Sequence, residues 1–174
     1  DLPMSREDIL AGVDAVVVSH IHSDHFDKAA QEYLDKSLPV LCQPWEAASI
    51  LAMGFQDVRP VDESYRLGDV EITRTYAKHG SGAVQKEMGE ASGFVFKAPG
   101  EPTIYWPGDT ILCDEVRNVL IKEKPAGVIT HSAGARIDLV RDPRGRIKEI
   151  VDTAGNSIRY SYDAAGNLAT FSNQ

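Results

Sequence analysis

The sequence of 174 residues is poor in cysteine and has no long apolar run. Its two cysteines, Cys42 and Cys113, lie far apart and form no Cys-x-x-Cys pair, so they indicate free thiols rather than a disulfide framework. No apolar stretch approaches the length of a membrane span, and no signal peptide is recognisable. We therefore expect no membrane partner and a cytoplasmic location.

Positive charge is also scarce. The 18 Lys and Arg residues against 26 Asp and Glu residues give a formal net charge of −8. A nucleic-acid binder needs a basic footprint, so we expect no nucleic-acid partner. The charges of residues 138–174 cancel, and the whole negative excess belongs to residues 1–137. We expect bound cations to offset part of it.

Histidine is rare as well, yet three of the five histidines fall in the run His20-Ile21-His22-Ser23-Asp24-His25. Imidazoles bind divalent metals through a neutral nitrogen, and carboxylates prefer hard cations. Four such groups at the end of an apolar strand predict a site for two metal ions, and paired metal ions activate water for hydrolysis. Disordered His-rich tracts also bind metal, but this run lies between a strand pattern and a helix pattern.

Up to about residue 137, strand patterns alternate with helix patterns. We predict helices over 5–10, 27–36, 45–53 and 114–122, the first capped by Ser5 and the last by Asp114. We predict strands over 13–19, 39–42, 57–61, 70–76, 93–97, 103–106 and 127–130. Strands interleaved with helices indicate a layered α/β architecture.

Residues 138–174 follow a different pattern. An Asp-x-x-Gly turn recurs at Asp142–Gly145, Asp152–Gly155 and Asp163–Gly166. Aspartate supplies a side-chain hydrogen bond, and glycine supplies the positive φ that tight turns need. The strand-like segments around these turns, 135–141, 146–151, 157–162 and 168–172, predict an antiparallel β-meander. It has no histidine, cysteine or clustered carboxylates, so we interpret it as structural.

Three motifs of the first stretch resemble those of the metallo-β-lactamase superfamily. The first is His-x-His-x-Asp-His after an apolar strand, at His20 to His25. The segment Tyr76-Ala77-Lys78-His79-Gly80 is similar to the one that carries the family's third histidine. Tyr105-Trp106-Pro107-Gly108-Asp109-Thr110 is similar to the Gly-Asp-Thr segment that carries the bridging aspartate. The resemblance implies a partial αββα metallo-β-lactamase-like sandwich over residues 1–137, forming a metal-binding hydrolase core.

The resemblance also implies a set of ligands: one metal held by His20, His22 and His79, a second held by Asp24 and His25, and Asp109 bridging both. His20 and His22 are separated by one residue, so they point the same way from an extended segment. The alternatives are that Asp109 is a turn or helix-capping aspartate and that His79 is a surface histidine without a partner.

The sequence departs from the family at both ends. Family members have further strands ahead of the first motif and a final histidine that completes the second metal site. Without those strands a sheet edge or an apolar face would be exposed. We expect the meander over 138–174 to pack on the core and complete a sheet; a second chain in a homodimer is the alternative. His131 follows the predicted strand 127–130, and its position leaves open whether it completes the second site or lies beside it.

These features predict a metal-dependent hydrolase with two divalent metal ions. Zinc is the default for a histidine-rich site, with manganese or iron as alternatives. The metals would supply a hydroxide nucleophile, and Asp24 or Asp109 would orient the water or pass its proton to the leaving group. We expect a small-molecule ester as the substrate. A phosphodiester or phosphotriester is preferred, because paired metals stabilise both the attacking and the leaving oxygen of phosphorus displacement. Lactones and β-lactams are also consistent with this scaffold.

Two other hypotheses remain open. The meander resembles Rhs/YD repeats, which form parts of large β-shell proteins. The chain would then be a non-catalytic structural or toxin-associated Rhs-like fragment with a vestigial metal site, which binds metal without turnover. A site of this kind could also hold iron and serve redox chemistry, which colour and elemental analysis would reveal.

Overall fold

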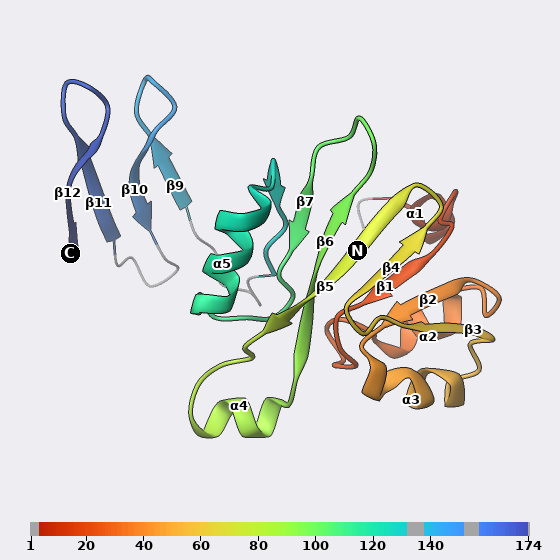
Figure 1. The fold of residues 1–174 in the computed structure, drawn as a ribbon. Helices are drawn as coiled ribbons and strands as arrows, with labels where there is room; N and C mark the ends of the chain where they lie inside the picture. Colours follow the sequence, from red (N-terminus) through yellow and green to blue (C-terminus); the bar gives the residue numbers. More distant parts are fainter. Residues whose placement is uncertain (1–3, 132–137, 152–156, 174) are drawn as a thin grey trace. The chain divides into compact units, whose positions relative to one another are not determined.

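The computed structural model of the chain describes residues 4–131, 138–151 and 157–173 (Figure 1). The chain divides into two compact units, Asp1–His131 and Ser132–Gln174. The described strands form a three-stranded and a five-stranded sheet in the first unit and a four-stranded sheet in the second. No helix in these ranges is long and apolar enough to cross a membrane.

The smaller sheet of the first unit is parallel. Its strands are β1 (Val16–Val18), β2 (Pro39–Cys42) and β3 (Asp57–Pro60), in that order. Parallel neighbours need crossover connections. These contain α2 (Lys28–Tyr33) after β1, and η1 (Pro44–Glu46) with α3 (Ala47–Ala52) after β2. A short helix, α1 (Arg6–Leu10), precedes the sheet and is capped by Ser5 as predicted.

The larger sheet is mixed. Its strands, in order, are β4 (Ser64–Leu67), β5 (Val70–Ala77), β6 (Ala91–Lys97), β7 (Ile104–Trp106) and β8 (Gly127–Val128). The pairs β4–β5, β5–β6 and β6–β7 are antiparallel, and β8 lies parallel to β7. Helix α4 (Ala83–Met88) interrupts the connection from β5 to β6. Helix α5 (Asp114–Glu123) provides the crossover from β7 to β8.

The alternation of side chains along β2 explains how the layers stack. Val40 and Cys42 belong to a buried cluster with Ile50 of α3, whereas Leu41 belongs to a second cluster with Phe94 of the larger sheet. Successive side chains of a strand point to opposite faces, so one strand packs against a helix layer and a sheet layer at once. Burial on both faces is typical of a parallel sheet covered by other layers.

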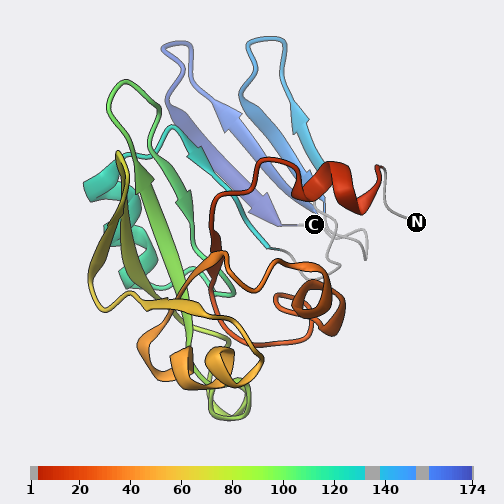
Figure 2. The same ribbon diagram turned by 90° about the vertical axis from the view of Figure 1, so that its right-hand side faces the viewer.

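A third cluster covers the far face of the larger sheet. Val95 of β6 and Tyr105 of β7 pack there against Val116 of α5. The layer order is therefore α2 and α3, the smaller sheet, the larger sheet, and α5. Figures 1 and 2 show α5 and the α2–α3 pair on opposite sides of the two sheets. The predicted α/β class and partial αββα sandwich are confirmed.

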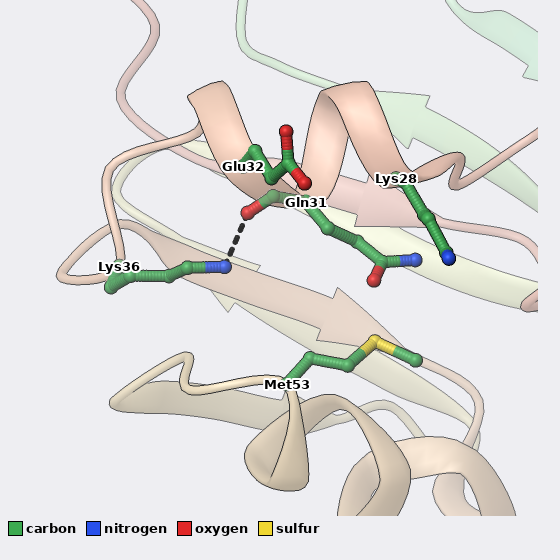
Figure 3. A pocket seen from close by; sticks show the side chains of 5 residues that line it. All are labelled: Lys28, Gln31, Glu32, Lys36 and Met53. Atoms are coloured by element: carbon green, nitrogen blue, oxygen red, sulfur yellow. Dashed lines mark hydrogen bonds between the residues drawn. The ribbon is translucent and has the colours of Figure 1, made fainter.

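A shallow surface pocket lies between α2 and the end of α3. It is lined by Lys28, Gln31, Glu32, Lys36 and Met53 (Figure 3). The Lys36 ammonium donates to the carbonyl oxygen of Gln31 and also lies over the ring of Phe55. None of the predicted metal ligands lines this pocket.

Most predicted elements of the first unit are present with shifted ends. The strand predicted over 13–19 is reduced to β1, and the helix over 27–36 to α2, with Asp27 as its N-cap. The prediction that Asp114 caps the last helix is wrong. Cys113 has the extended backbone of the cap, and Asp114 is the first helical residue. Strand β4 and helix α4 were not predicted, because β4 is short and half-polar and glycines flank α4 closely.

The second unit is an antiparallel meander of β9 (Asp138–Arg141), β10 (Ile147–Val151), β11 (Ser157–Tyr162) and β12 (Leu168–Asn173). Two of the three turns are as predicted. Asp142 Oδ1 accepts from the backbone N–H of Arg146 at 3.0 Å, and Asp163 Oδ1 from that of Asn167 at 2.8 Å. The turn over 152–155 and residues 135–137 lie outside the described residues. The boundary after residue 137 and the packing of the meander on the core stay predictions.

Candidate metal centre

The predicted ligands of the first unit follow the carboxyl ends of its strands. His20 comes after β1, His79 after β5, Asp109 after β7 and His131 after β8. The two sheets are joined near this edge, where the N–H of Ser92 at the start of β6 donates to Ser19 O at 3.1 Å. Side chains more than a hundred residues apart in the sequence are thereby brought to one place.

Three of these histidines form one group. Ligand atoms of His20, His22 and His79 lie within 4.8 Å of one another. His20 Nε2 faces His22 Nδ1 at 2.9 Å, and the ring centroid of His79 lies 4.9 Å from that of His20. Three imidazole nitrogens converging on one point form the donor set that Zn²⁺ and similar ions prefer.

The other four predicted ligands form a second group. Ligand atoms of Asp24, His25, Asp109 and His131 also lie within 4.8 Å of one another. Asp24 Oδ2 lies 3.6 Å from His25 Nε2 and 3.5 Å from His131 Nε2. The sequence left the position of His131 open, and the structure brings it into the second group. Its role as a ligand stays a prediction.

The carboxylate of Asp109 lies between the two groups. Its Oδ1 is 3.0 Å from His25 Nε2, and its Oδ2 is 3.2 Å from His79 Nε2. This side chain is 12% exposed, so its two oxygens are largely shielded from water. One largely shielded carboxylate therefore faces a nitrogen of each group, which is the arrangement expected of a ligand shared by two cations.

The donor atoms fit a metal better than they fit one another. His25 Nε2 and Asp109 Oδ1 are close, yet neither has a hydrogen-bond partner among the described residues, because the directions of approach are unsuitable. Buried polar atoms without a partner are costly and rare in folded proteins. A divalent cation held by both atoms would satisfy them, and a set of imidazoles and carboxylates is suited to zinc, manganese or iron.

Protonation favours the same conclusion. Burial, together with the neighbouring rings of His25 and His22, lowers the pKa of His20 to about 4. Burial is also the main cause that lowers the pKa of His79, although the Asp109 carboxylate opposes the shift. The pKa of Asp24 is lowered chiefly by its own backbone N–H. Neutral imidazoles and an ionised carboxylate are the forms that bind metal.

Gly108 determines where Asp109 can lie. Its φ is +63°, and a Cβ at this position would lie 2.4 Å from Ser92 O and 3.4 Å from the Cβ of Ser19. Only glycine combines this backbone conformation with so close an approach. The Asp109 loop therefore packs directly against the ends of β1 and β6.

The same loop is tied to the segment that carries His79. Thr110 Oγ1 accepts from the N–H of Lys78 at 2.9 Å, and the N–H of Ile111 donates to Lys78 O at 2.9 Å. These bonds hold Asp109 and His79 on adjacent backbone segments. They explain why the two side chains meet although β6 lies between β5 and β7 in the sheet.

Glu46 was missed by the sequence analysis. It ends η1, and its Oε1 accepts from the N–H of Ile21 at 2.8 Å, between the two histidines of the His-x-His pair. Burial raises the pKa of its carboxyl group, while the Ile21 N–H opposes the shift. No motif spacing points to this residue, because its contact depends on how the crossover after β2 returns to the sheet.

Residues 2–140 match the family described as Beta-lactamase superfamily domain, so the chain belongs to the beta-lactamase superfamily. Residues 141–170 match the description RHS Repeat over a short stretch. This family agrees with the fold of the first unit, with the three sequence motifs and with the clustered side chains.

Relatives within this superfamily carry a more particular name. UPF0173 protein YddR of Bacillus subtilis (strain 168) is 33% identical over 141 residues, which cover 79% of this chain and 56% of the relative. A UPF0173 metal-dependent hydrolase of Solibacter usitatus (strain Ellin6076) is 35% identical over 106 residues, covering 56% of this chain and 45% of the relative. The chain spans about half the length of the curated relatives it matches.

Two solved structures are similar at comparable identity. A possible metal-dependent hydrolase from Veillonella parvula DSM 2008 superposes with a TM-score of 0.71 and 36% identity, covering 74% of this chain and 52% of that one. An isothiocyanate hydrolase from Delia radicum gut bacteria superposes with a TM-score of 0.66 and 35% identity, covering 72% and 51%.

Proposed function

We propose that this chain provides the metal centre of a hydrolase that uses metal-activated water. The observation that carries the proposal is the position of Asp109, whose two oxygens face His25 and His79 at 3.0 and 3.2 Å. The names of several relatives of this chain, which are called metal-dependent hydrolases, support the same activity. Bound ions would lower the pKa of a water molecule toward neutrality and polarise the substrate.

We assign seven side chains to two divalent ions, with zinc as the default. His20, His22 and His79 would hold one ion, and Asp24, His25 and His131 the other, with Asp109 shared. The Asp24 side chain is 53% exposed, whereas that of Asp109 is 12% exposed. Asp24 is therefore the carboxylate placed to orient a water molecule or to take its proton. Asp109 would serve only as the ligand shared by the two ions.

For the substrate we propose a small phosphodiester or phosphotriester. Its phosphorus centre develops charge on both the attacking and the leaving oxygen, and two adjacent cations would stabilise both. The Asp24 carboxylate, at the exposed side of the second group, would take the proton of the attacking water and pass it to the leaving alcohol. Lactones and β-lactams are also consistent with this scaffold.

The isothiocyanate hydrolase among the similar structures favours a second substrate class. In such a reaction the water oxygen bonds to the central carbon of R–N=C=S, and the carbon–nitrogen bond breaks. The two protons of water go to nitrogen, which yields R–NH₂ and O=C=S. An ionised Asp24 could receive the first proton and return it to the nitrogen.

A substrate panel on the full chain would test both classes. After loading with zinc, manganese or iron and elemental analysis, turnover would be measured on a nitrophenyl phosphodiester, a phosphotriester, a lactone, a chromogenic β-lactam and an aryl isothiocyanate. We expect zinc-dependent turnover of one class, lost in the isosteric variant Asp24→Asn. Stoichiometric metal without turnover of any substrate would contradict the hydrolase proposal. That result would favour the alternative of a non-catalytic Rhs-like fragment, to which the match over 141–170 points.

A further inference from the structure

Glu46 is an acidic side chain outside the predicted ligand set, and it holds the backbone between two of those ligands. It belongs to η1, in the crossover after β2, and lies 25 residues beyond its partner. Its Oε1 accepts from the N–H of Ile21 at 2.8 Å. Because Ile21 separates His20 from His22, this bond restrains the peptide on which the relative orientation of both imidazoles depends.

The second oxygen of Glu46 has no assigned role. Glu46 Oε2 is buried and has no hydrogen-bond partner among the described residues. An unpartnered buried acceptor of this kind calls for a donor that is present in the working state of the protein. Desolvation raises the pKa of Glu46, whereas the Ile21 N–H, the Gln43 side chain and the ring of His22 oppose this shift, in that order. The His22 ring is therefore among the groups that face the carboxylate.

His22 offers a suitable donor. Its Nδ1 faces His20 Nε2 at 2.9 Å, on the side where the histidines converge. The other ring nitrogen, Nε2, therefore points away from that convergence. If Nδ1 gives its lone pair to a cation, the ring hydrogen has to reside on Nε2 and needs an acceptor.

We propose that Glu46 is a positioning residue of the metal centre, with Oε1 fixing the Ile21 amide and Oε2 accepting the hydrogen of His22 Nε2. The inference rests on the proposed binding of a cation by His20 and His22. A carboxylate behind a ligating histidine selects the tautomer, orients the ring and raises the basicity of the ligating nitrogen. Glu46 would thus prepare Nδ1 of His22 for the metal without touching the metal itself.

The isosteric variant Glu46→Gln tests the proposal most directly. A side-chain amide has one acceptor and one donor group, so it cannot accept from both Ile21 N–H and His22 Nε2–H. We expect Zn²⁺ affinity, measured in competition with a chromogenic chelator, to fall about 10- to 100-fold. Glu32→Gln makes the same change on the exposed face of α2 (Figure 3) and should leave the affinity unchanged. Glu46→Ala should weaken binding at least as much as Glu46→Gln.

A second measurement separates positioning from a merely structural role. In zinc-loaded protein labelled with ¹⁵N-histidine, long-range ¹H–¹⁵N spectra should show His22 with its hydrogen on Nε2, and that hydrogen should exchange faster in Glu46→Gln. A structural role alone would lower the urea midpoint of the metal-free variant but keep the zinc affinity and these spectra as in the wild type. Wild-type affinity in Glu46→Gln would overturn the inference. Turnover enters neither measurement, so a wild-type chain that binds zinc without hydrolysing any ester would overturn only the hydrolase proposal.

Discussion

Asp109 Oδ2 lies 3.2 Å from His79 Nε2, although the two residues follow different strands of the larger sheet and are separated by β6. The contact exists because Thr110 and Ile111 are hydrogen-bonded to Lys78, next to His79. The other oxygen of the same carboxylate reaches His25. One side chain thus connects the imidazoles of two separate groups, and the predictions for the metal centre depend on it.

Asp109→Asn should weaken metal binding and reduce turnover strongly, because a neutral amide offers one acceptor oxygen where the carboxylate offers two charged ones. Changes to residues that merely support a ligand cost about 10- to 100-fold in affinity, so loss of a shared ligand should cost more than about 100-fold. Elemental analysis after desalting, with turnover measured in parallel, checks this. An Asp109→Asn chain that keeps its full metal content and turnover would remove Asp109 from the centre.

His131→Ala should remove one of the two proposed ions and leave the other in place. His131 is close to Asp24 and His25 but belongs to neither the first group nor the protein core. Its side chain is 33% exposed, so the loss should change the free energy of unfolding by no more than about 1 kcal/mol. Metal-to-protein ratios of the variant and the wild type decide the matter. Equal ratios would show that His131 stands beside the second site without binding.

Gly108→Ala should destabilise the first unit. The new Cβ would lie 2.4 Å from Ser92 O, and overpacking of this kind costs about 1–3 kcal/mol. Gly68→Ala is a matched control, because Gly68 also has a positive φ but nothing lies within 4 Å of its Cβ position. Both variants carry backbone strain, and only Gly108→Ala adds the clash. Urea unfolding of the two variants gives the difference; equal losses of stability would contradict the steric argument.

The metal-free protein should lose stability as the pH falls from about 6.5 to about 4. Over this range the unfolded chain protonates His20, whose ordinary pKa is 6.5, while folded His20, with a pKa of about 4, remains neutral. The unfolded state then binds more protons than the folded state, so the free energy of unfolding decreases as the pH decreases. His20 contributes roughly 3 kcal/mol to this loss. His79 shifts in the same direction.

Urea titrations at pH 7.5, 6.0 and 5.0 in the presence of a chelator would measure this loss. The rings of His22, His25 and His79 and the carboxylate of Asp109 act on His20 and contribute to its titration. Because glutamine does not titrate, a His20→Gln chain should show a much shallower dependence of stability on pH. A stability that is flat from pH 7.5 to 5.0 in the wild type would be incompatible with buried neutral imidazoles.

Deletion of residues 138–174 should reduce solubility if the meander covers an exposed part of the first unit, as we predict. An uncovered sheet edge or apolar face promotes association. Light scattering of the full chain and of residues 1–137 compares the two forms. A full chain that is itself a dimer would favour a second chain as the cover. A monomeric, metal-binding fragment 1–137 would show that the first unit needs neither.

Local patterns predicted much of this protein because they depend on neighbours in the sequence. The His-x-His spacing, the apolar alternation of the strands and the Asp-x-x-Gly turns at Asp142 and Asp163 all act within a few residues. Element ends were less predictable. Cys113 rather than Asp114 caps α5, because the backbone there is extended by the preceding loop.

The sequence by itself determined the donor types, the order of most strands and helices, and the glycine that the turn before Asp109 requires. The tertiary structure decided which donors meet. His131 joins Asp24 only because α5 returns β8 to lie parallel to β7, and Glu46 reaches Ile21 only because the crossover after β2 returns to the end of β1. Contacts of this kind depend on packing between segments that are distant in the sequence. The residues next to His131 and Glu46 in the sequence form no local pattern that predicts these contacts.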